Sequence, residues 1–238
     1  KRADCSVAMA SGSEAAKCVS QIVLADNDFA SMPHIVAEGR RTIQNIQRSA
    51  SLFLVKNIFS ILLSIIVVVC GVSYPFQSIQ LSFIGGLTIG IPSFVLAMEY
   101  NNNRIRGNFF LNIITGALPA GITIALNVIL MMMFGNWLGL SESVIETISV
   151  MITAFTLFTL VVKISLPFNK LRFILVSFIF VGLIIGFVFA NDFINTVHLG
   201  LYSFVIMLLF LSVSLGMFYL LTKVCQVFKG KIIKKYYS

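Results

Sequence analysis

Apolar residues along this chain gather in six runs, each about 20 residues long or longer, separated by short polar segments. An α-helix of about 20 apolar residues is long enough to cross roughly 30 Å of hydrocarbon. The pattern therefore predicts an all-α polytopic membrane protein with six transmembrane helices. The expected spans, which form a transmembrane domain over 52–222, are 52–71, 79–98, 109–134, 144–164, 171–190 and 199–222.

The N-terminal segment has a different, mixed pattern. β-like runs at Cys5–Met9 and Gln21–Leu24 flank a helix-prone stretch at Glu14–Cys18. This order predicts a βαβ-like segment over 1–30, which is too short to bury a core alone. Because the chain also starts without Met inside this segment, we expect it to be part of a longer protein.

A polar helix is predicted over 31–51, directly before the first span. Ser31 is a candidate cap, Pro33 suits the first turn, and no Gly or Pro follows Gly39 before the membrane. No turn signal separates this stretch from the first apolar run. We therefore expect a stalk helix that continues into the bilayer.

Lys and Arg residues lie before the first span, between spans two and three, between spans four and five, and after span six. The other three loops, 72–78, 135–143 and 191–198, contain neither. By the positive-inside rule we expect both termini in the cytosol and a multi-pass protein of the plasma membrane. Residues 223–238 form a basic cytosolic tail, for which lipid binding and a simple stop-transfer anchor are both compatible with the sequence.

Composition narrows the possible functions. The chain is 58% hydrophobic and 11% charged, which makes the lipid bilayer its main surrounding. Its net charge of +8 lies between apolar runs and forms no basic face, so no nucleic-acid partner is expected. The four cysteines lack metal-ligand spacing, and neither a nucleophile with a base nor a phosphate loop is present. We therefore predict no metal centre and no catalytic residues within this chain.

The first span carries a polar face. Lys56 and Asn57, with Ser60 and Ser64 following at helical spacing, line one side of an otherwise apolar helix. Charged groups inside a membrane are costly, so such residues are candidates for an ion path. The alternative is that Lys56 extends to the interface and the serines bond to their own backbone.

The second span carries Gly85 and Gly86, then Thr88, Gly90 and Pro92. Pro92 lacks an N–H and frees a carbonyl near Thr88, while the glycines allow unwinding. Freed carbonyls and a hydroxyl are hard oxygen ligands for a cation, although a plain proline kink is equally compatible. The predicted ion path is Lys56, Asn57, Ser60, Thr88, Gly90 and Pro92.

Glu99 follows the second span directly. Its position at the expected interface favours a residue bonded to a neighbouring helix or loop over an ion ligand.

Several short stretches within residues 1–60 carry a resemblance to a known family. They are Ala3-Asp4, Val7–Met9, Gly12, Ala16-Lys17, Val23-Leu24, Asp26–Phe29, Gly39-Arg40 and Asn45-Ile46. With these residues, the segment resembles the junction between the phosphorylation domain and the membrane domain of P-type cation-transporting ATPases. The resemblance implies that 1–30 are the C-terminal remnant of a HAD-like phosphorylation domain, followed by the last six transmembrane helices. It also implies that Mg and ATP bind upstream, where the D-K-T-G-T and G-D-G-x-N-D motifs would lie.

The resemblance extends to the candidate ion path. Asn57 and Ser60 fall where calcium pumps of the family carry an asparagine and a glutamate ligand, and Thr88–Gly90 falls where they carry Thr-Asp-Gly. The two carboxylates are missing here, which favours one ion per cycle and a remaining carboxylate on an absent upstream helix. These departures resemble a bacterial subclass that includes calcium-uptake pumps.

The resemblance implies an ATP-driven pump for calcium or another metal cation. Its partners would be the actuator, the nucleotide-binding domain and the first transmembrane helices of the same protein. The chain alone should not hydrolyse ATP. Two alternatives remain: a passive channel or secondary transporter with a pump-like stalk, and a non-functional truncated membrane scaffold.

Overall fold

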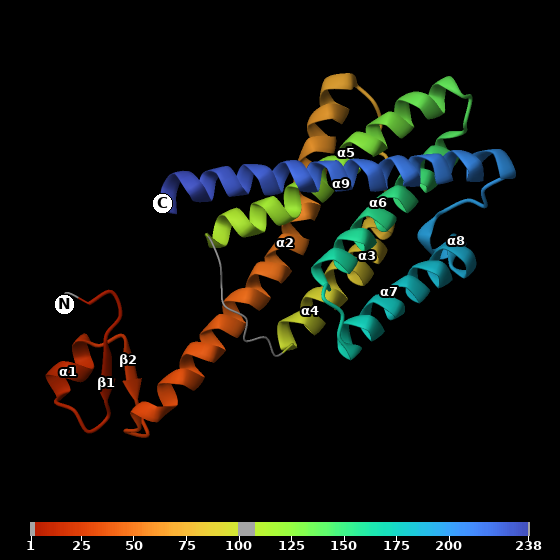
Figure 1. Cartoon of the computed structure of the whole chain (residues 1–238). Helices are drawn as coiled ribbons and strands as arrows, with labels where there is room; N and C mark the ends of the chain where they lie inside the picture. Colours follow the sequence, from red (N-terminus) through yellow and green to blue (C-terminus); the bar gives the residue numbers. More distant parts are fainter. Residues whose placement is uncertain (1–2, 100–107, 238) are drawn as a thin grey trace. The chain divides into compact units, whose positions relative to one another are not determined.

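A computed structural model describes residues 3–99 and 108–237 (Figure 1). The chain divides into two compact units, with the boundary inside one long helix between Ile43 and Gln44. Arg104 and Arg106, two of the basic residues used to predict the orientation, lie outside the described residues.

The N-terminal unit confirms the predicted βαβ order. Strand β1 (Val7–Met9) pairs in parallel with β2 (Ile22–Leu24), and helix α1 (Glu14–Val19) connects them. Ser13 caps α1 by accepting a hydrogen bond from the Ala16 N–H at 3.2 Å. Ala8 and Leu24 are the two buried hydrophobic residues of this unit among those described. The unit is therefore too small to hold a core of its own, as expected.

The stalk and first span form one helix, α2 (Met32–Cys70), which has 39 residues. A 3-10 turn, η1 (Phe29–Ser31), precedes it, and Pro33 lies in its first turn. The prediction that Ser31 caps the helix is wrong. Because the extra turn moves the start upstream, Asp28 accepts the Ala30 N–H at 2.8 Å, while the Ser31 hydroxyl donates to the Asp28 carbonyl.

Six helices are long and apolar enough to cross a membrane, which confirms an all-α polytopic membrane protein. The second crossing combines three contiguous segments, and a short helix α8 precedes the last crossing. After α2, the elements are α3 (Ser78–Gly85), η2 (Gly86–Gly90), α4 (Ile91–Met98), α5 (Phe109–Trp137), α6 (Glu142–Ile164), α7 (Lys170–Phe189), α8 (Asn191–Ile194) and α9 (Leu201–Tyr237).

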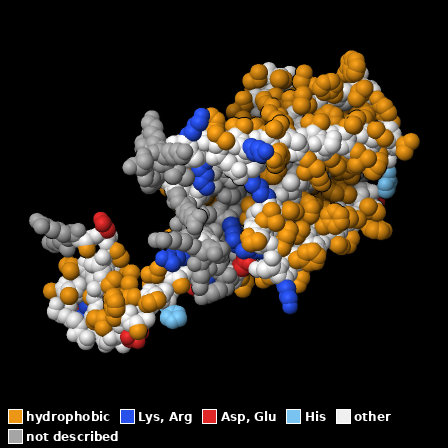
Figure 2. Space-filling view, in the orientation of Figure 1, with side chains coloured by type: hydrophobic (Ala, Val, Ile, Leu, Met, Phe, Trp, Pro, Cys, Tyr) orange, Lys and Arg blue, Asp and Glu red, His pale blue; other side chains and the backbone are white. Residues whose placement is uncertain are grey.

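Helix α6 is the centre of the second unit. Its most apolar stretch is 67% buried, compared with 22% for the corresponding stretches of α2 and α9. Helix α9 packs across α5 and α6, and a hydrogen bond of 2.7 Å joins Thr156 on α6 to Ser214 on α9 (Figure 1). Hydrophobic side chains cover much of the visible outer face, as expected for helices that contact lipid (Figure 2).

Glycines allow close contacts between helices in this unit. A Cβ added to Gly121 on α5 would lie 2.5 Å from Ile58 on α2, and one added to Gly186 on α7 would meet the Phe83 ring on α3. Small residues at such contacts let membrane helices approach closely. The second span can therefore lie this close to α7 because Gly186 has no side chain.

Candidate transport site

The second span contains a π-helical turn, η2, directly before Pro92. The Ile91 N–H donates to the carbonyl of Gly86, five residues earlier. The prediction of an unwound helix is therefore wrong, because a widened turn lets the chain pass Pro92 without a break. The helix is nevertheless irregular at the position predicted from Pro92 and the glycines. Such π-turns occur often at functional sites.

Thr88, in the middle of this turn, is fully buried. Its hydroxyl donates to the carbonyl of Ile84 at 2.7 Å, a bond within its own helix. The hydroxyl oxygen keeps lone pairs that can accept or coordinate. Its proton, however, satisfies a backbone carbonyl near the turn.

Lys56 lies beside the second span. Its Nζ is 4.0 Å from the position that a Cβ on Gly85 would take. With Ile89 and Thr153 it lines a small cavity of about 10 Å³, which is close to the minimum for one water molecule. The described residues therefore provide no space for a hydrated ion at this point.

The other predicted residues are not gathered around that cavity. Asn57 is exposed and Ser60 is half-buried, and neither forms a hydrogen bond within the described residues. Gly90 is exposed, whereas Pro92 is buried. The six candidates thus form an exposed face on α2 and a mostly buried turn in the second span, but no closed site. Among the described residues, no cluster of His, Cys, Asp or Glu fits a metal ion.

A buried ionic network lies at the end of the second span. Glu99, with 6% of its surface exposed, accepts two hydrogen bonds from Arg172 Nε, at 2.8 and 3.0 Å. Arg172 Nη2 adds a third at 2.8 Å, and Arg48 Nη1 donates to the same carboxylate at 2.8 Å. Two arginines from α2 and α7 therefore hold one carboxylate at the foot of α4.

Neutral groups complete this network. Asn169 Nδ2 donates to Glu99 at 2.6 Å, while its Oδ1 accepts the Arg172 N–H and caps α7. The Asn45 amide donates to the carbonyls of Ala97 at 2.8 Å and Glu99 at 3.0 Å. Helices α2, α4 and α7 are thereby joined by charge-assisted and neutral hydrogen bonds.

Two opposing effects act on the pKa of the Glu99 carboxyl, which lies outside the membrane-spanning segment. Burial, the largest single effect, raises it. Hydrogen bonds from Arg172 and Asn169, together with the charges of Arg172 and Arg48, lower it. The hydrogen bonds and positive charges together outweigh burial, so the pKa of Glu99 lies below its ordinary value and the carboxylate stays ionised.

Sequence reasoning identified only part of this network. The interpretation of Glu99 as a residue bonded to neighbouring helices is confirmed, but Arg48 and Arg172 were counted only as basic residues that orient the chain. The sequence position of Glu99 did indicate such a partner, because a carboxylate at the end of an apolar run requires a cationic partner if it is buried. The sequence does not reveal which of the nearby basic residues supplies it.

Comparisons with known proteins identify relatives among transport ATPases. The chain is 44% identical to "Calcium-transporting ATPase CtpE" of Mycolicibacterium smegmatis over 52% of the chain and 17% of that protein. It is 33% identical to "Probable cation-transporting ATPase exp7" of Streptococcus pneumoniae over 74% of the chain and 24% of that protein. It is also 39% identical to "Potassium-transporting ATPase alpha chain 2" of the rat over 42% of the chain.

No protein-family model matches the chain. The chain spans about a fifth of the length of the first two relatives. Over the aligned residues, these relatives confirm the resemblance found in the sequence. The chain is a homologue of P-type cation-transporting ATPases.

Proposed function

We propose that this chain is the membrane portion of an ATP-driven cation pump and that calcium or another metal cation is the transported ion. The observation that carries the proposal is helix α2, which runs without interruption from the βαβ unit through the first span. The relatives of this chain that are named calcium- and cation-transporting ATPases support the same function. In this proposal, residues 1–30 belong to a HAD-like phosphorylation domain and 31–51 form the stalk.

The whole pump would bind ATP and Mg outside this chain and pass through a phosphorylated intermediate. Because α2 is continuous from Met32 to Cys70, a movement of the phosphorylation domain would reach the first span through this helix. The Lys56 and Asn57 face would then meet upstream helices of the same protein. The basic loops and tail support cytosolic termini and a plasma-membrane location.

Lys56 has a specific part in this proposal. Its ammonium lies next to Gly85 and Ile89, beside the π-turn of the second span. When no cation is bound, the long flexible side chain would place a positive charge near the turn. A bound cation would displace it by repulsion, so Lys56 would stabilise the empty state of the path.

The proposal is tested with the full-length protein in lipid vesicles. We expect a cation, calcium first, to stimulate ATP hydrolysis and the formation of a phosphorylated protein. Asn57→Ala should weaken this stimulation, because its exposed amide supplies an oxygen ligand on the polar face of α2. Gln226→Ala, which changes an exposed amide on α9, is the matched control.

Two results would count against the proposal. Cation flux without ATP consumption would favour the channel or secondary transporter, and the absence of both flux and hydrolysis would favour a scaffold. Equal stimulation in Asn57→Ala and wild type would remove Asn57 from the ion path while leaving the pump proposal in place.

A further inference from the structure

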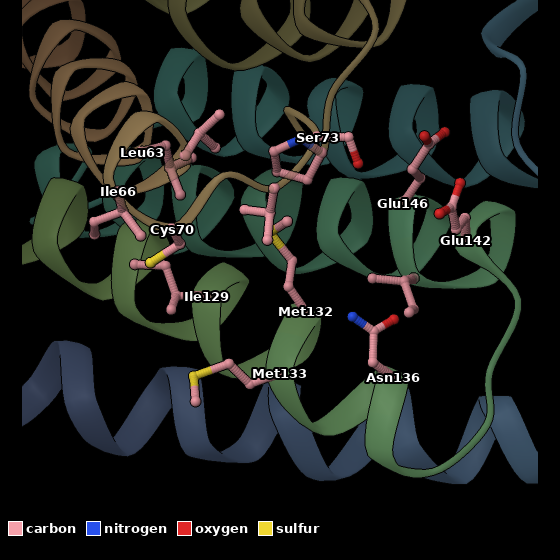
Figure 3. Close-up of a pocket in the computed structure, with 14 residues that line it drawn as sticks. Leu63, Ile66, Cys70, Ser73, Ile129, Met132, Met133, Asn136, Glu142 and Glu146 are labelled. Atoms are coloured by element: carbon pink, nitrogen blue, oxygen red, sulfur yellow. The ribbon is translucent and has the colours of Figure 1, made fainter.

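A cavity of about 310 Å³ lies at the end of the second unit that lacks basic loop residues (Figure 3). Its wall comes from the last turns of α2, the segment 72–75, the end of α5 and the start of α6. This volume is at the lower end of the range for small-molecule sites in proteins. It is far larger than the space beside Lys56.

The body of the cavity is apolar. Leu63 and Ile66 of α2 face Ile129 and Met132 of α5 (Figure 3). Ile145 of α6 also lines the cavity. Methionine side chains adapt to irregular ligands because they are flexible and polarisable. The cavity therefore suits a hydrophobic group of variable shape.

Its polar groups are acidic. Glu142 and Glu146, one helical turn apart on α6, lie next to each other, and Figure 3 shows the Asn136 amide nearby. Neither carboxylate forms an ion pair with any Lys or Arg in the described part of the chain. Glu146 accepts one long hydrogen bond, 3.4 Å, from Gln77. No residue that lines the cavity is basic.

A purely structural role explains only one of these carboxylates. Glu142 lies in the first turn of α6, where a negative charge is favoured by the helix dipole. Glu146 lies beyond that turn and is half-buried at the edge of an apolar cavity, where an unpaired charge is unfavourable. A cation bound between the two would satisfy both.

From this geometry we propose that the cavity binds a small organic cation with an apolar body, of the alkylammonium or arylammonium class. The ammonium group pairs with Glu142 and Glu146, while the apolar body lies among Leu63, Met132 and Ile145. A calcium ion fits less well, because it takes six to eight oxygen ligands and most of this wall is hydrocarbon. The site does not depend on the proposed pump function.

Cys70 provides a reporter, because its thiol is exposed and lines the cavity. The full-length protein is placed in lipid nanodiscs, and an uncharged maleimide modifies it with increasing octylammonium at constant pH. Peptide mass spectrometry gives the modification rate of Cys70 separately from that of the other cysteines. We expect octylammonium to slow the reaction of Cys70 and octanol, its neutral analogue, to have much less effect.

The double variant Glu142→Gln with Glu146→Gln should raise the half-protecting concentration of octylammonium by about tenfold, since two charge-assisted contacts are lost. Asp192→Asn, which removes an exposed carboxylate in the α7–α9 segment at the same end, is the matched control and should retain protection. Each rate is compared with that of the same variant without octylammonium. This comparison removes any direct effect of the charges on the thiol.

Four results would overturn the proposal. Equal protection by octanol would show a hydrophobic hollow only, and unchanged protection in the double variant would exclude the carboxylates. Protection by calcium at lower concentration than by octylammonium would indicate a metal site instead. A Cys70 that stays unreactive without octylammonium would show that another part of the full-length protein or a lipid already fills the cavity.

Discussion

The middle and the foot of the second span differ in how their polar groups are satisfied. At the foot, Glu99 meets two arginines and an asparagine. Glu99 and Arg172 are buried, and the network joins three helices. In the middle, Thr88 bonds only within its own helix. Lys56 and Asn57 are exposed, and neither has an ion pair or hydrogen bond among the described residues. A satisfied network holds structure together, whereas a polar face without partners inside a membrane is a candidate for contact with an ion or another helix.

The largest expected effect is at the foot. Glu99→Ala removes the carboxylate that pairs with the buried Arg172. Breaking a buried ion pair in this way costs about 3–5 kcal/mol of stability. We expect a strong fall in the unfolding temperature of the purified protein, measured by fluorescence during heating in detergent. Glu142→Gln, which removes an exposed carboxylate at the start of α6, is the control and should change the unfolding temperature little. An unfolding temperature in Glu99→Ala equal to that of wild type would contradict the structural role of the network.

A second prediction concerns the pH dependence of the same network. The pKa of Glu99 in the folded protein is lower than in the unfolded chain, mainly because hydrogen bonds and charge from Arg172 outweigh burial. The stabilisation is therefore complete above the unfolded pKa of about 4.3, and it is lost as the pH falls through the lower folded value. The unfolding temperature of wild type should fall through this window. Glu99→Gln should start lower and lose less over the same range, and parallel curves would rule out Glu99 as the titrating group.

Part of this comparison could be predicted from the sequence. Six spans, the stalk and the βαβ order were predictable because hydrophobic spacing and length act locally. The pairing of Arg172 with Glu99 was not, because these residues are 73 positions apart and meet only through packing of α7 against the second span.

The middle of the span shows the same limit. Pro92 and its glycines indicated a local irregularity, but sequence alone did not distinguish an unwound segment from a π-turn. That choice depends on where the carbonyl of Gly86 finds a donor. The direction in which Thr88 points likewise depends on the turn, so residues of the correct chemical type were placed in one site that the fold separates.

A third prediction separates structure from transport in the middle of the span. Thr88 and Thr123 are both fully buried, and each donates to a carbonyl four residues earlier. Replacing either by Val removes one hydrogen bond, so both variants should lose about 0.5–1.5 kcal/mol of stability. Only Thr88→Val should also weaken cation-stimulated ATP hydrolysis in the full-length protein. Equal transport defects in the two variants would assign the effect to stability alone.

The smallest expected change in stability is at Lys56, where an exposed side chain has no ion pair among the described residues. Lys56→Gln should alter stability by no more than about 0.5 kcal/mol, as is usual for surface positions. If the ammonium acts as a counter-charge beside the π-turn, the variant should nevertheless change the voltage or pH dependence of transport in vesicles. Lys170→Gln, an exposed lysine at the start of α7, is the control. Unchanged voltage and pH dependence would mean that Lys56 only extends to the membrane interface, and the functional part of the polar face would then begin at Asn57.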